Sequence, residues 1–354
     1  MNRILIVRLG AMGDIVHTLP ALATLRRAFP EARIDWAVER RWAPLLAGNR
    51  RLSALRVLDA EDWRKAPGST RTWRAVARFA AALREARYDV ALDFQGLLKS
   101  AIVAGLSGAP RVLGFARQDL REPLAALCYT GSARPAGGGH VVERNLNLAA
   151  HVGATEPVLE FECEPASQDV QTVRGTIGDA AGYIVINPGA GWAAKRWPEE
   201  AYAGLIVQLY KNLGRRTVMN CGPGEEPIAG RVSKLAAEAR PLALQPSVGE
   251  LIALVRGAAL VIGGDTGPVH LAAACGTPVV ALFGPTDPVR NRPLGAPARI
   301  LRAPEAATNY SRSAPRDAVR AIAVEEVYAA AAELLTTATD APVLPPLRLT
   351  PPPG

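Results

Sequence analysis

The stretch at residues 260–288, LVIGGDTGPVHLAAACGTPVVALFGPTDP, constrains the fold more than any other part of the chain. One apolar run ends at Gly263 and Gly264, and a second follows at residues 278–283. Between them, residues 265–268 (DTGP) predict a helix start, because Asp and Thr are preferred N-caps and proline suits the first helical turn. This order of strand, glycine turn, helix and strand is typical of a parallel α/β sheet.

The start of that helix is also a candidate ligand site. Its first backbone N–H groups lack partners within the helix, and the helix dipole favours negative charge there, so a phosphate would suit it. An ordinary capped helix without a ligand explains the same residues equally well. His270, on this helix, would either contact a phosphate or pack in the core.

Short apolar runs alternate with helical patterns through both halves of the chain, as in doubly wound parallel sheets. We expect one sheet from residues 3–9, 34–38, 54–58, 90–93 and 112–115, and another from residues 183–187, 217–221 and the two runs above. A chain of 354 residues is long enough for two domains. The sequence therefore predicts an α/β protein with two Rossmann-like domains facing a cleft, residues 1–160 and 161–338, and a disordered Pro-rich tail at residues 339–354.

The connections carry further expectations. Residues 132–140, SARPAGGGH, are too glycine-rich to hold a fixed shape and suit a loop that receives a substrate. Residues 156–165 are expected to be the linker. The turn at residues 10–14 should open a helix that runs to about Phe29. This turn lacks the G-x-G-x-x-G fingerprint, and no acidic residue is expected to end the second strand in the context of that fingerprint, so no nicotinamide cofactor is predicted.

All the excess positive charge lies in the first half of the chain. Residues 1–150 carry 23 Lys and Arg against 13 Asp and Glu, whereas residues 151–354 carry 18 against 20. Solubility, or the arginine enrichment of a GC-rich genome, is one explanation. The other is a first domain that meets a polyanion, either nucleic acid, an anionic membrane face or an acidic glycolipid. Nucleic acid is the weakest of these, because no RNP, helix-turn-helix or zinc-finger pattern occurs.

Cysteine spacing and hydropathy limit the class of protein further. The four cysteines lack CxxC spacing, so neither a zinc site nor a disulfide framework is indicated. The N-terminus has Arg8 within its apolar run and is expected to form a strand, not a signal peptide. No apolar run reaches the length of a membrane-spanning helix. We therefore expect a soluble, cytoplasmic protein.

Polar residues follow the expected strands of the first half where ligands bind in open α/β sheets. Asp14 ends the turn after the first strand, and His17 lies on the same helix face three residues later. Asp93 and Gln95 end another strand at the same edge. Together these side chains favour a cleft. Alternatively, Asp14 is only a helix cap.

Six segments of the chain together resemble one family. They are MNRILIVRLGAMGDIVHTLPALATLRRAFP, DFQGLLKSA, REPLAA, HVVERN, NPGAGWAAKRWPEE and GGDTGPVHLAAACGTPVVALFGPTDP. As a set they resemble the lipopolysaccharide core heptosyltransferases, family 9 glycosyltransferases with the two-domain GT-B fold. The resemblance covers about residues 1–335.

The resemblance implies an inverting, metal-independent transfer of heptose from ADP-L-glycero-D-manno-heptose. GDIVHTLPAL, WAVE, DFQGLLKSA, REPLA and HVVER look like heptosyltransferase I, which adds heptose to Kdo on lipid A, whereas PGAGWAAKRWP is closer to heptosyltransferase II. The first group is favoured, with the enzyme peripheral on the cytoplasmic face of the inner membrane. One departure is the segment AEDWRK, where Glu61 and Asp62 replace arginines of the family's acceptor side.

The resemblance also assigns residues. Asp14 would be the general base, and Lys195 would stabilise the departing ADP together with the N–H groups of Thr266 and Gly267. No D-x-D motif occurs, so no metal ligands are predicted. The implied donor-binding residues are Gly189, Lys195, Gly222, Glu225, Asp265, Thr266, Gly267 and His270. The implied acceptor-binding residues are Gly13, His17, Arg64, Lys65, Gln95, Arg121 and Arg144.

Two other classes of function remain open at this point. A different GT-B enzyme, such as a nucleotide-sugar epimerase, would not need the positive first half. A non-catalytic protein that binds anionic glycolipids would not need a nucleotide site at Lys195 and Asp265.

Overall fold

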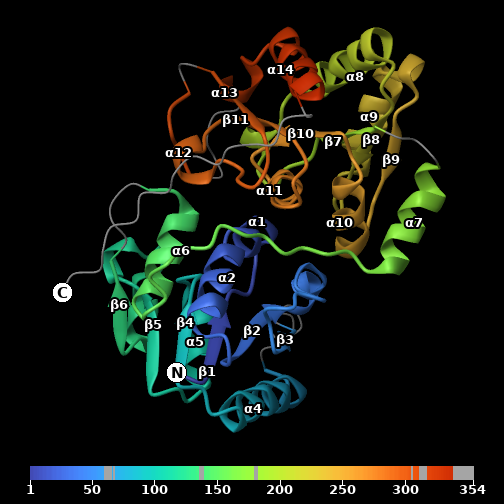
Figure 1. The fold of residues 1–354 in the computed structure, drawn as a ribbon. Coiled ribbons are helices and arrows are strands. Elements are labelled where there is room, and N and C mark those ends of the chain that lie inside the picture. Colours follow the sequence, from blue (N-terminus) through green and yellow to red (C-terminus); the bar gives the residue numbers. More distant parts are fainter. Residues whose placement is uncertain are drawn as a thin grey trace. The chain divides into compact units, whose positions relative to one another are not determined.

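The computed structural model describes residues 1–59, 66, 68–134, 139–178, 182–303, 306–310 and 317–337. These residues form two compact units, Met1–Phe161 and a second unit that begins at Glu162. Each unit contains one six-stranded sheet in which every neighbouring pair of strands is parallel (Figure 1).

The sheet of the first unit has the strand order β3-β2-β1-β4-β5-β6. Its strands are β1 (Arg3–Val7), β2 (Arg33–Glu39), β3 (Ala54–Leu58), β4 (Val90–Asp93), β5 (Arg111–Phe115) and β6 (Gly131–Ala133). Val7 pairs with Ala37 of β2 and Asp93 of β4, so the carboxyl ends of these three strands lie at one edge of the sheet. Polar residues that follow these strands are therefore brought together.

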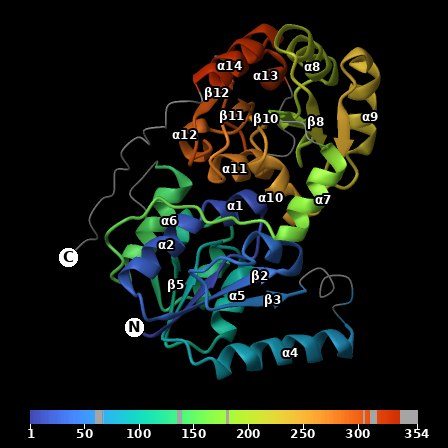
Figure 2. The ribbon, with the colours of Figure 1, turned by 45° about the vertical axis from the view of Figure 1, so that its right-hand side comes forward.

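Helices cover both faces of this sheet. They are α1 (Met12–Val16), α2 (Leu19–Ala28), η1 (Arg40–Leu45), α4 (Thr70–Glu85), α5 (Leu98–Leu106), η2 (Arg117–Asp119), η3 (Pro123–Cys128) and α6 (Val141–Ala150). Helices α2 and α6 pack together (Figure 1), and α4 and α5 lie beside each other (Figure 2). Side chains of α4 and α5 belong to the core cluster that contains Leu5 and Val7. The chain reverses its direction across the sheet between β3 and β4, and right-handed crossovers then place α4 and α5 on the face opposite α2.

The sheet of the second unit has the strand order β12-β11-β10-β7-β8-β9. Its strands are β7 (Ile184–Asn187), β8 (Thr217–Asn220), β9 (Leu242–Leu244), β10 (Leu260–Gly264), β11 (Val279–Phe283) and β12 (Ala298–Arg302). The central strands β7, β10 and β11 are buried along their whole length. This is expected of parallel strands that helices cover on both faces.

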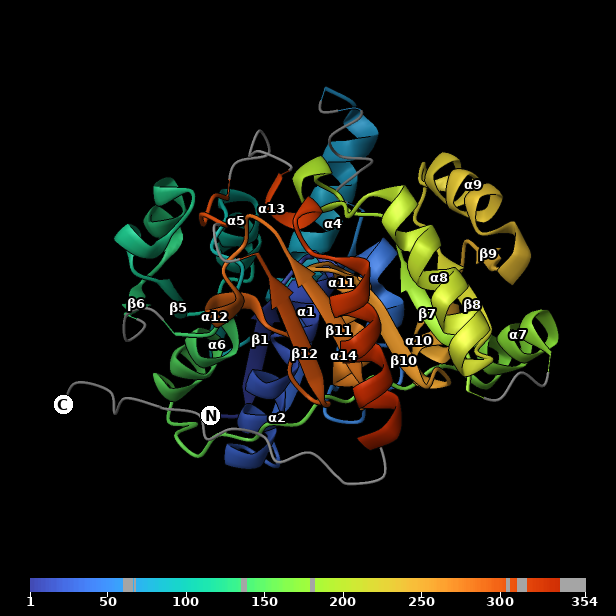
Figure 3. The same ribbon diagram turned by 90° about the horizontal axis from the view of Figure 1, so that it is seen from above.

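The helices of the second unit are α7 (Ser167–Ile177), η4 (Ala193–Lys195), α8 (Glu199–Leu213), α9 (Glu226–Leu235), η5 (Ala237–Ala239), α10 (Val248–Arg256), α11 (Gly267–Ala274), α12 (Pro288–Asn291), α13 (Asp317–Arg320) and α14 (Val324–Thr337). Helices α8 and α14 pack together over one face of the sheet (Figure 3). Their apolar side chains meet Ile184, Ile262 and Leu282 in one core cluster. None of the helices within the described residues is long and apolar enough to cross a membrane.

One expectation for the first unit is wrong. The helix expected from the Gly10 turn to Phe29 is broken into α1 and α2, because Pro20 has no N–H to donate to the carbonyl of Val16. The second strand ends on an acidic residue, Glu39, whose carboxylate lies 2.9 Å from Lys99 and 3.3 Å from Arg41.

Several short elements were also not predicted. Residues 131–133, at the start of the segment expected to be a loop, form strand β6 and pair with β5. Strands β9 and β12 and helix α7 were not expected either. Residues 135–138 and the Pro-rich tail at residues 339–354 lie outside the described residues.

Candidate active site

The donor residues implied by the resemblance follow three neighbouring strands of the second unit. Gly189 and Lys195 follow β7, Gly222 and Glu225 follow β8, and the segment from Asp265 to His270 follows β10. Because these strands are parallel neighbours, their carboxyl ends bring the three loops to one edge of the sheet.

Asp265 is the centre of this group. Its side chain is 4% exposed, and its Oδ2 accepts from Lys195 Nζ at 2.6 Å and from the hydroxyl of Thr286 at 2.7 Å. Its Oδ1 lies 2.8 Å from Nε2 of His270. Burial alone would raise the pKa of Asp265, but the hydrogen bond and charge of His270 and the ammonium of Lys195 outweigh burial and hold the pKa well below its usual range. Asp265 is therefore ionised, and Nε2 of His270 carries the proton that it donates.

Lys195 is fixed by these contacts. Its ammonium also donates to the backbone carbonyl of Asp265 at 3.0 Å and lies 5.1 Å from the centre of the Trp192 ring. Glycine at residue 264 also lets the backbone of Lys195 lie close to the end of β10, since a Cβ there would come within 2.7 Å of the Lys195 carbonyl oxygen. The positive charge is thus held beside the start of α11.

Helix α11 begins after Thr266, which is one of the two N-cap candidates in the sequence. Thr266, not Asp265, occupies the N-cap position, and neither side chain caps the helix. The Thr266 hydroxyl instead donates to the carbonyl of Gly264 at 3.1 Å. The carboxylate of Asp265 is used on Lys195, His270 and Thr286, so its role is to fix side chains of the site.

A network of buried amides connects the strand ends. Asn187, the last residue of β7, donates through Nδ2 to the Gly189 carbonyl at 2.9 Å and to the Thr266 hydroxyl at 3.2 Å. Its Oδ1 accepts from Asn220, the last residue of β8, at 2.6 Å. These contacts set the positions of the three loops relative to one another.

Glu225 lies against two glycines. Its carboxylate accepts from the backbone N–H of Gly222 at 2.8 Å. A Cβ at Gly189 would lie 1.9 Å from Oε2 of Glu225, so only glycine fits at residue 189 with Glu225 in this place. The structure therefore brings Gly189, Gly222 and Glu225 together, as the resemblance implies.

Asp14 lies in α1, beyond the carboxyl end of β1 in the first unit. Its side chain is 48% exposed, and its Oδ1 is 2.7 Å from Nη2 of Arg8, whose side chain is 7% exposed. Oδ2 has a longer contact, 3.4 Å, with the backbone N–H of Ala11. Asp14 is thus fixed by the buried Arg8, and the rest of its carboxylate remains accessible to solvent.

Asp93 ends β4 and Gln95 follows it at the same sheet edge, and Asp93 differs from Asp14 in burial. Asp93 is fully buried and accepts four hydrogen bonds, from the backbone N–H groups of Gln95 and Gly96 and from the hydroxyls of Ser100 and Tyr129. Burial raises the pKa of Asp93, although these hydrogen bonds act in the opposite direction. Asp93 is therefore placed to hold the loop together.

The other predicted acceptor residues lie around this edge. Gly13 is within α1, and Oε1 of Gln95 accepts from the backbone N–H of Leu9 at 2.8 Å. His17 is buried at the end of α1, with its ring centre 5.4 Å from that of His140. Its carbonyl accepts from Asn145 of α6 at 2.9 Å.

The arginines predicted for the acceptor are placed differently from one another. Arg144 donates to the carbonyl of Asp119 at 3.2 Å and lies over the Phe115 ring, whereas Arg121 is exposed in the segment before η3. Arg64 and Lys65 lie outside the described residues.

Sequence reasoning missed several residues that complete these two groups. Thr286 and Asn187 are buried partners of Asp265 and Thr266, and Asn220 is a buried partner of Asn187. Two of them end strands, the same signal that singled out Asp93 and Gln95. Arg8 was used only as an argument against a signal peptide.

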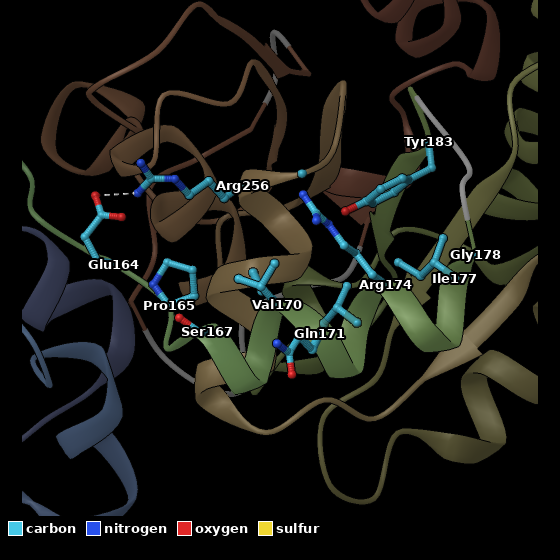
Figure 4. A pocket seen from close by; sticks show the side chains of 13 residues that line it. Glu164, Pro165, Ser167, Val170, Gln171, Arg174, Ile177, Gly178, Tyr183 and Arg256 are labelled. Atoms are coloured by element: carbon cyan, nitrogen blue, oxygen red, sulfur yellow. Dashed lines mark ion pairs between the residues drawn. The ribbon is translucent and has the colours of Figure 1, made fainter.

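A separate cavity of about 860 Å³ lies in the second unit, mainly between α7 and α10 (Figure 4). Its lining includes Tyr183, which precedes β7, and Gly257, which precedes β10. It therefore opens at the amino ends of the strands, the edge opposite Lys195. An ion pair of 2.7 Å between Glu164 and Arg256 lies beside it (Figure 4).

Comparison with known proteins identifies the class. The solved structure of Escherichia coli heptosyltransferase WaaC with ADP matches this chain with a TM-score of 0.76 and 29% identity, covering 94% of this chain and 99% of that one. With the two parallel six-stranded sheets, this likeness confirms the predicted α/β, GT-B fold.

The chain belongs to glycosyltransferase family 9 (heptosyltransferase), whose family model matches residues 76–318. Lipopolysaccharide heptosyltransferase 1 of Pseudomonas aeruginosa is 34% identical over 81% of this chain and 79% of its own length. Lipopolysaccharide heptosyltransferase 1 of Escherichia coli K12 is 33% identical over 85% of this chain and 94% of its own. The protein is therefore a glycosyltransferase, and the predicted family is confirmed.

Proposed function

We propose that the protein transfers heptose from ADP-L-glycero-D-manno-heptose to a Kdo residue of lipid A-Kdo in the inner core of lipopolysaccharide. Relatives named lipopolysaccharide heptosyltransferase 1, at 33–34% identity, support this choice over the heptosyltransferase II reaction. The proposal assigns the acceptor to the N-terminal unit, about residues 1–160, and the donor to the C-terminal unit, about residues 161–338.

The observation that carries the donor assignment is the fixed positive group at the start of α11. Lys195 is held there by Asp265, and the backbone N–H groups of Thr266 and Gly267 are at the helix terminus, where no intrahelical partner exists. Such groups suit the diphosphate of ADP and stabilise it as it departs with the bonding electron pair. We assign the donor site to these residues and to Gly189, Gly222, Glu225 and His270, with no metal ion.

Asp14 is assigned as the general base. Its accessible carboxylate takes the proton of the acceptor hydroxyl as that oxygen attacks the anomeric carbon of heptose. The bond between the anomeric carbon and the diphosphate oxygen breaks on the opposite side, so the configuration inverts. In this assignment Asp14 accepts the proton of the acceptor hydroxyl, and Lys195 stabilises the negative charge on the departing ADP.

The acceptor assignment rests on positive charge in the first unit. We assign Arg121 and Arg144 to the phosphate and carboxylate groups of the acceptor, because guanidinium groups bind such anions through two hydrogen bonds. Gly13, His17 and Gln95 line the same sheet edge and complete the proposed acceptor side. Arg64 and Lys65 belong to the proposal from the sequence alone.

The test is direct. The protein is incubated with ADP-heptose and Kdo₂-lipid A, and the lipid is examined for a mass increase of one heptose, with and without EDTA. An increase that survives EDTA is expected. An increase only when the acceptor already carries one heptose would establish the heptosyltransferase II reaction instead, and ADP binding without transfer to either acceptor would contradict the proposal.

We further propose that the enzyme acts as a peripheral protein at the cytoplasmic face of the inner membrane. The face of the first unit formed by α4, α5 and η3 carries exposed apolar side chains, namely Trp73, Leu98, Ile102, Leu124 and Leu127. Exposed arginines lie on the same elements or beside them, namely Arg71, Arg74, Arg78, Arg117 and Arg121. Apolar side chains among cations suit a surface of anionic phospholipid.

Vesicle binding tests this location. Sedimentation with vesicles that contain phosphatidylglycerol is expected, with weaker binding to pure phosphatidylcholine. Replacing Leu124 and Leu127 by Ser should reduce binding, whereas Leu235→Ser, an exposed leucine of the second unit, is the matched control. Equal binding by all three proteins would contradict the assignment of this face.

A further inference from the structure

Arg8 is a buried cation that contacts the carboxylate of the proposed base, Asp14. It follows β1, and only 7% of its side chain is exposed. Its backbone is fixed on the side of β2, since its N–H donates to the Ala37 carbonyl at 3.3 Å and its carbonyl accepts from Nε1 of Trp36 at 3.0 Å. On the other side, Nη1 donates to the Phe94 carbonyl just beyond β4. The guanidinium therefore has a fixed place between two strand ends.

The second guanidinium nitrogen reaches Asp14. Nη2 lies 2.7 Å from Oδ1, which is the closest polar contact of that carboxylate within the described residues. Among the residues that the structure describes, Oδ2 has one contact, at 3.4 Å with the Ala11 N–H. One carboxylate oxygen is thus held by a fixed charge, and the other, with its single long contact, can accept a proton.

We propose that Arg8 is a positioning residue for the reaction: it holds Oδ1 of Asp14 and so orients the carboxylate with Oδ2 towards the acceptor hydroxyl. This inference rests on the proposed function, in which Asp14 is the base. Arginine remains protonated at any working pH and has no acceptor atom, so it cannot take the proton itself. Its effect on the rate must therefore pass through Asp14.

A purely structural role for Arg8 predicts something different. A buried guanidinium also joins the ends of β1 and β4 through the Phe94 carbonyl, and its loss would loosen the sheet edge whether or not residue 14 carries a charge. The two roles are separated by asking whether the loss of Arg8 still matters when Asp14 is already neutral.

A double-mutant cycle answers this question. Arg8→Gln keeps a donor for the Phe94 carbonyl but removes the charge. We expect it to lower kcat by roughly 10- to 100-fold, as for a misplaced catalytic group, with the ADP-heptose KM nearly unchanged. In an Asp14→Asn protein, the same change should lower the single-turnover rate by less than about twofold.

Two further variants complete the design. Arg8→Lys keeps the charge and should give a kcat between those of the wild type and Arg8→Gln. Arg56→Gln is the matched control, because Arg56 also pairs with a buried carboxylate of this unit, Asp35, at 2.8 Å. It should lower the thermal stability without any coupling to Asp14→Asn. If Arg8→Gln does not fold, the cycle is run with Arg8→Lys, and its smaller rate loss should also vanish beside Asp14→Asn.

The outcomes are distinguishable. If Asp14→Asn retains a near-normal rate, the assignment of the base fails and this inference fails with it. If Asp14→Asn is slow but Arg8→Gln lowers the rate by the same factor in both backgrounds, the proposed base stands and the positioning role of Arg8 is overturned.

Discussion

The two units place one carboxylate each just beyond the carboxyl end of a central strand, and the two carboxylates are held in opposite ways. Asp265 is buried, and its two oxygens meet Lys195, Thr286 and His270. Asp14 is half exposed, and its only charged partner among the described residues is Arg8. A carboxylate whose oxygens are all in short contacts can fix other groups, whereas an exposed carboxylate with one long contact, such as Oδ2 of Asp14, can accept a proton.

The largest effect that this contrast predicts is that of Asp14→Asn on the rate. Asn is nearly isosteric and can still contact Ala11, so a merely structural Asp14 would tolerate the change. If Asp14 is the base, the rate should fall by roughly two to four powers of ten. ADP-heptose titration and a thermal melt, both expected to be near wild type, show that binding and fold persist. Near-normal turnover would end the assignment and send the search to Asp93 or His17, both of which are buried.

The second prediction concerns Lys195→Ala, which removes a cation from both ADP and Asp265. ADP affinity should fall by roughly 10- to 100-fold, the usual loss for one charged hydrogen bond. The free energy of unfolding should also fall by about 3 kcal/mol, because a buried carboxylate loses its cation.

Lys211→Ala is the control for this change, since Lys211 pairs with Glu238 at 2.9 Å where both side chains are half exposed. It should leave ADP affinity unchanged. Activity that EDTA abolishes and a divalent ion restores would show that the metal-free assignment is wrong.

The third prediction asks whether charge in the first unit serves the acceptor alone. Arg121→Ala should raise the acceptor KM by roughly 3- to 10-fold, the effect of one partly solvated guanidinium contact, and leave ADP affinity unchanged. The measurement is made at moderate salt, where screening does not hide the effect. An unaltered acceptor KM would separate the positive charge of this unit from acceptor recognition.

The smallest effect is the pH dependence of stability at Asp265. The pKa of Asp265 is lowered in the folded protein, so ionised Asp265 stabilises the fold. Its contribution to the free energy of unfolding is complete above the pKa of the unfolded chain, about 4, and is lost as the pH falls towards the pKa of the folded protein. The difference in free energy of unfolding between wild type and Asp265→Asn should be constant from about pH 5 to 7 and shrink below about pH 4. A difference that persists undiminished in acid would contradict the ionised, paired state.

The sequence predicted the central strands of both sheets well. Residues 90–93 form the central strand β4 with the expected bounds, and residues 54–58 form β3, the one edge strand that was also predicted. Their patterns are local, because a short apolar run between turns can be recognised without its neighbours. The edge strands β6, β9 and β12 were missed because they are short or contain charged residues, and their pairing depends on strands elsewhere in the chain.

The candidate site was predictable only where a motif marked it. Lys195 and Asp265 are 70 residues apart, yet the turns around each indicated a ligand site, and the structure joins them in one ion pair. Arg8 and Thr286 lie in no motif that indicated a ligand site. Their importance comes from burial beside a carboxylate, which depends on how the strand ends meet in space.

The separate sheets of the two units have a consequence for cooperativity. The backbone hydrogen bonds of each sheet are made within that sheet, and each unit has its own buried core. A chain built in this way can lose one sheet while the other persists, so its heat capacity trace should contain two transitions and not a single all-or-none event. A nucleotide that binds only the second unit would then raise the midpoint of one transition and leave the other in place.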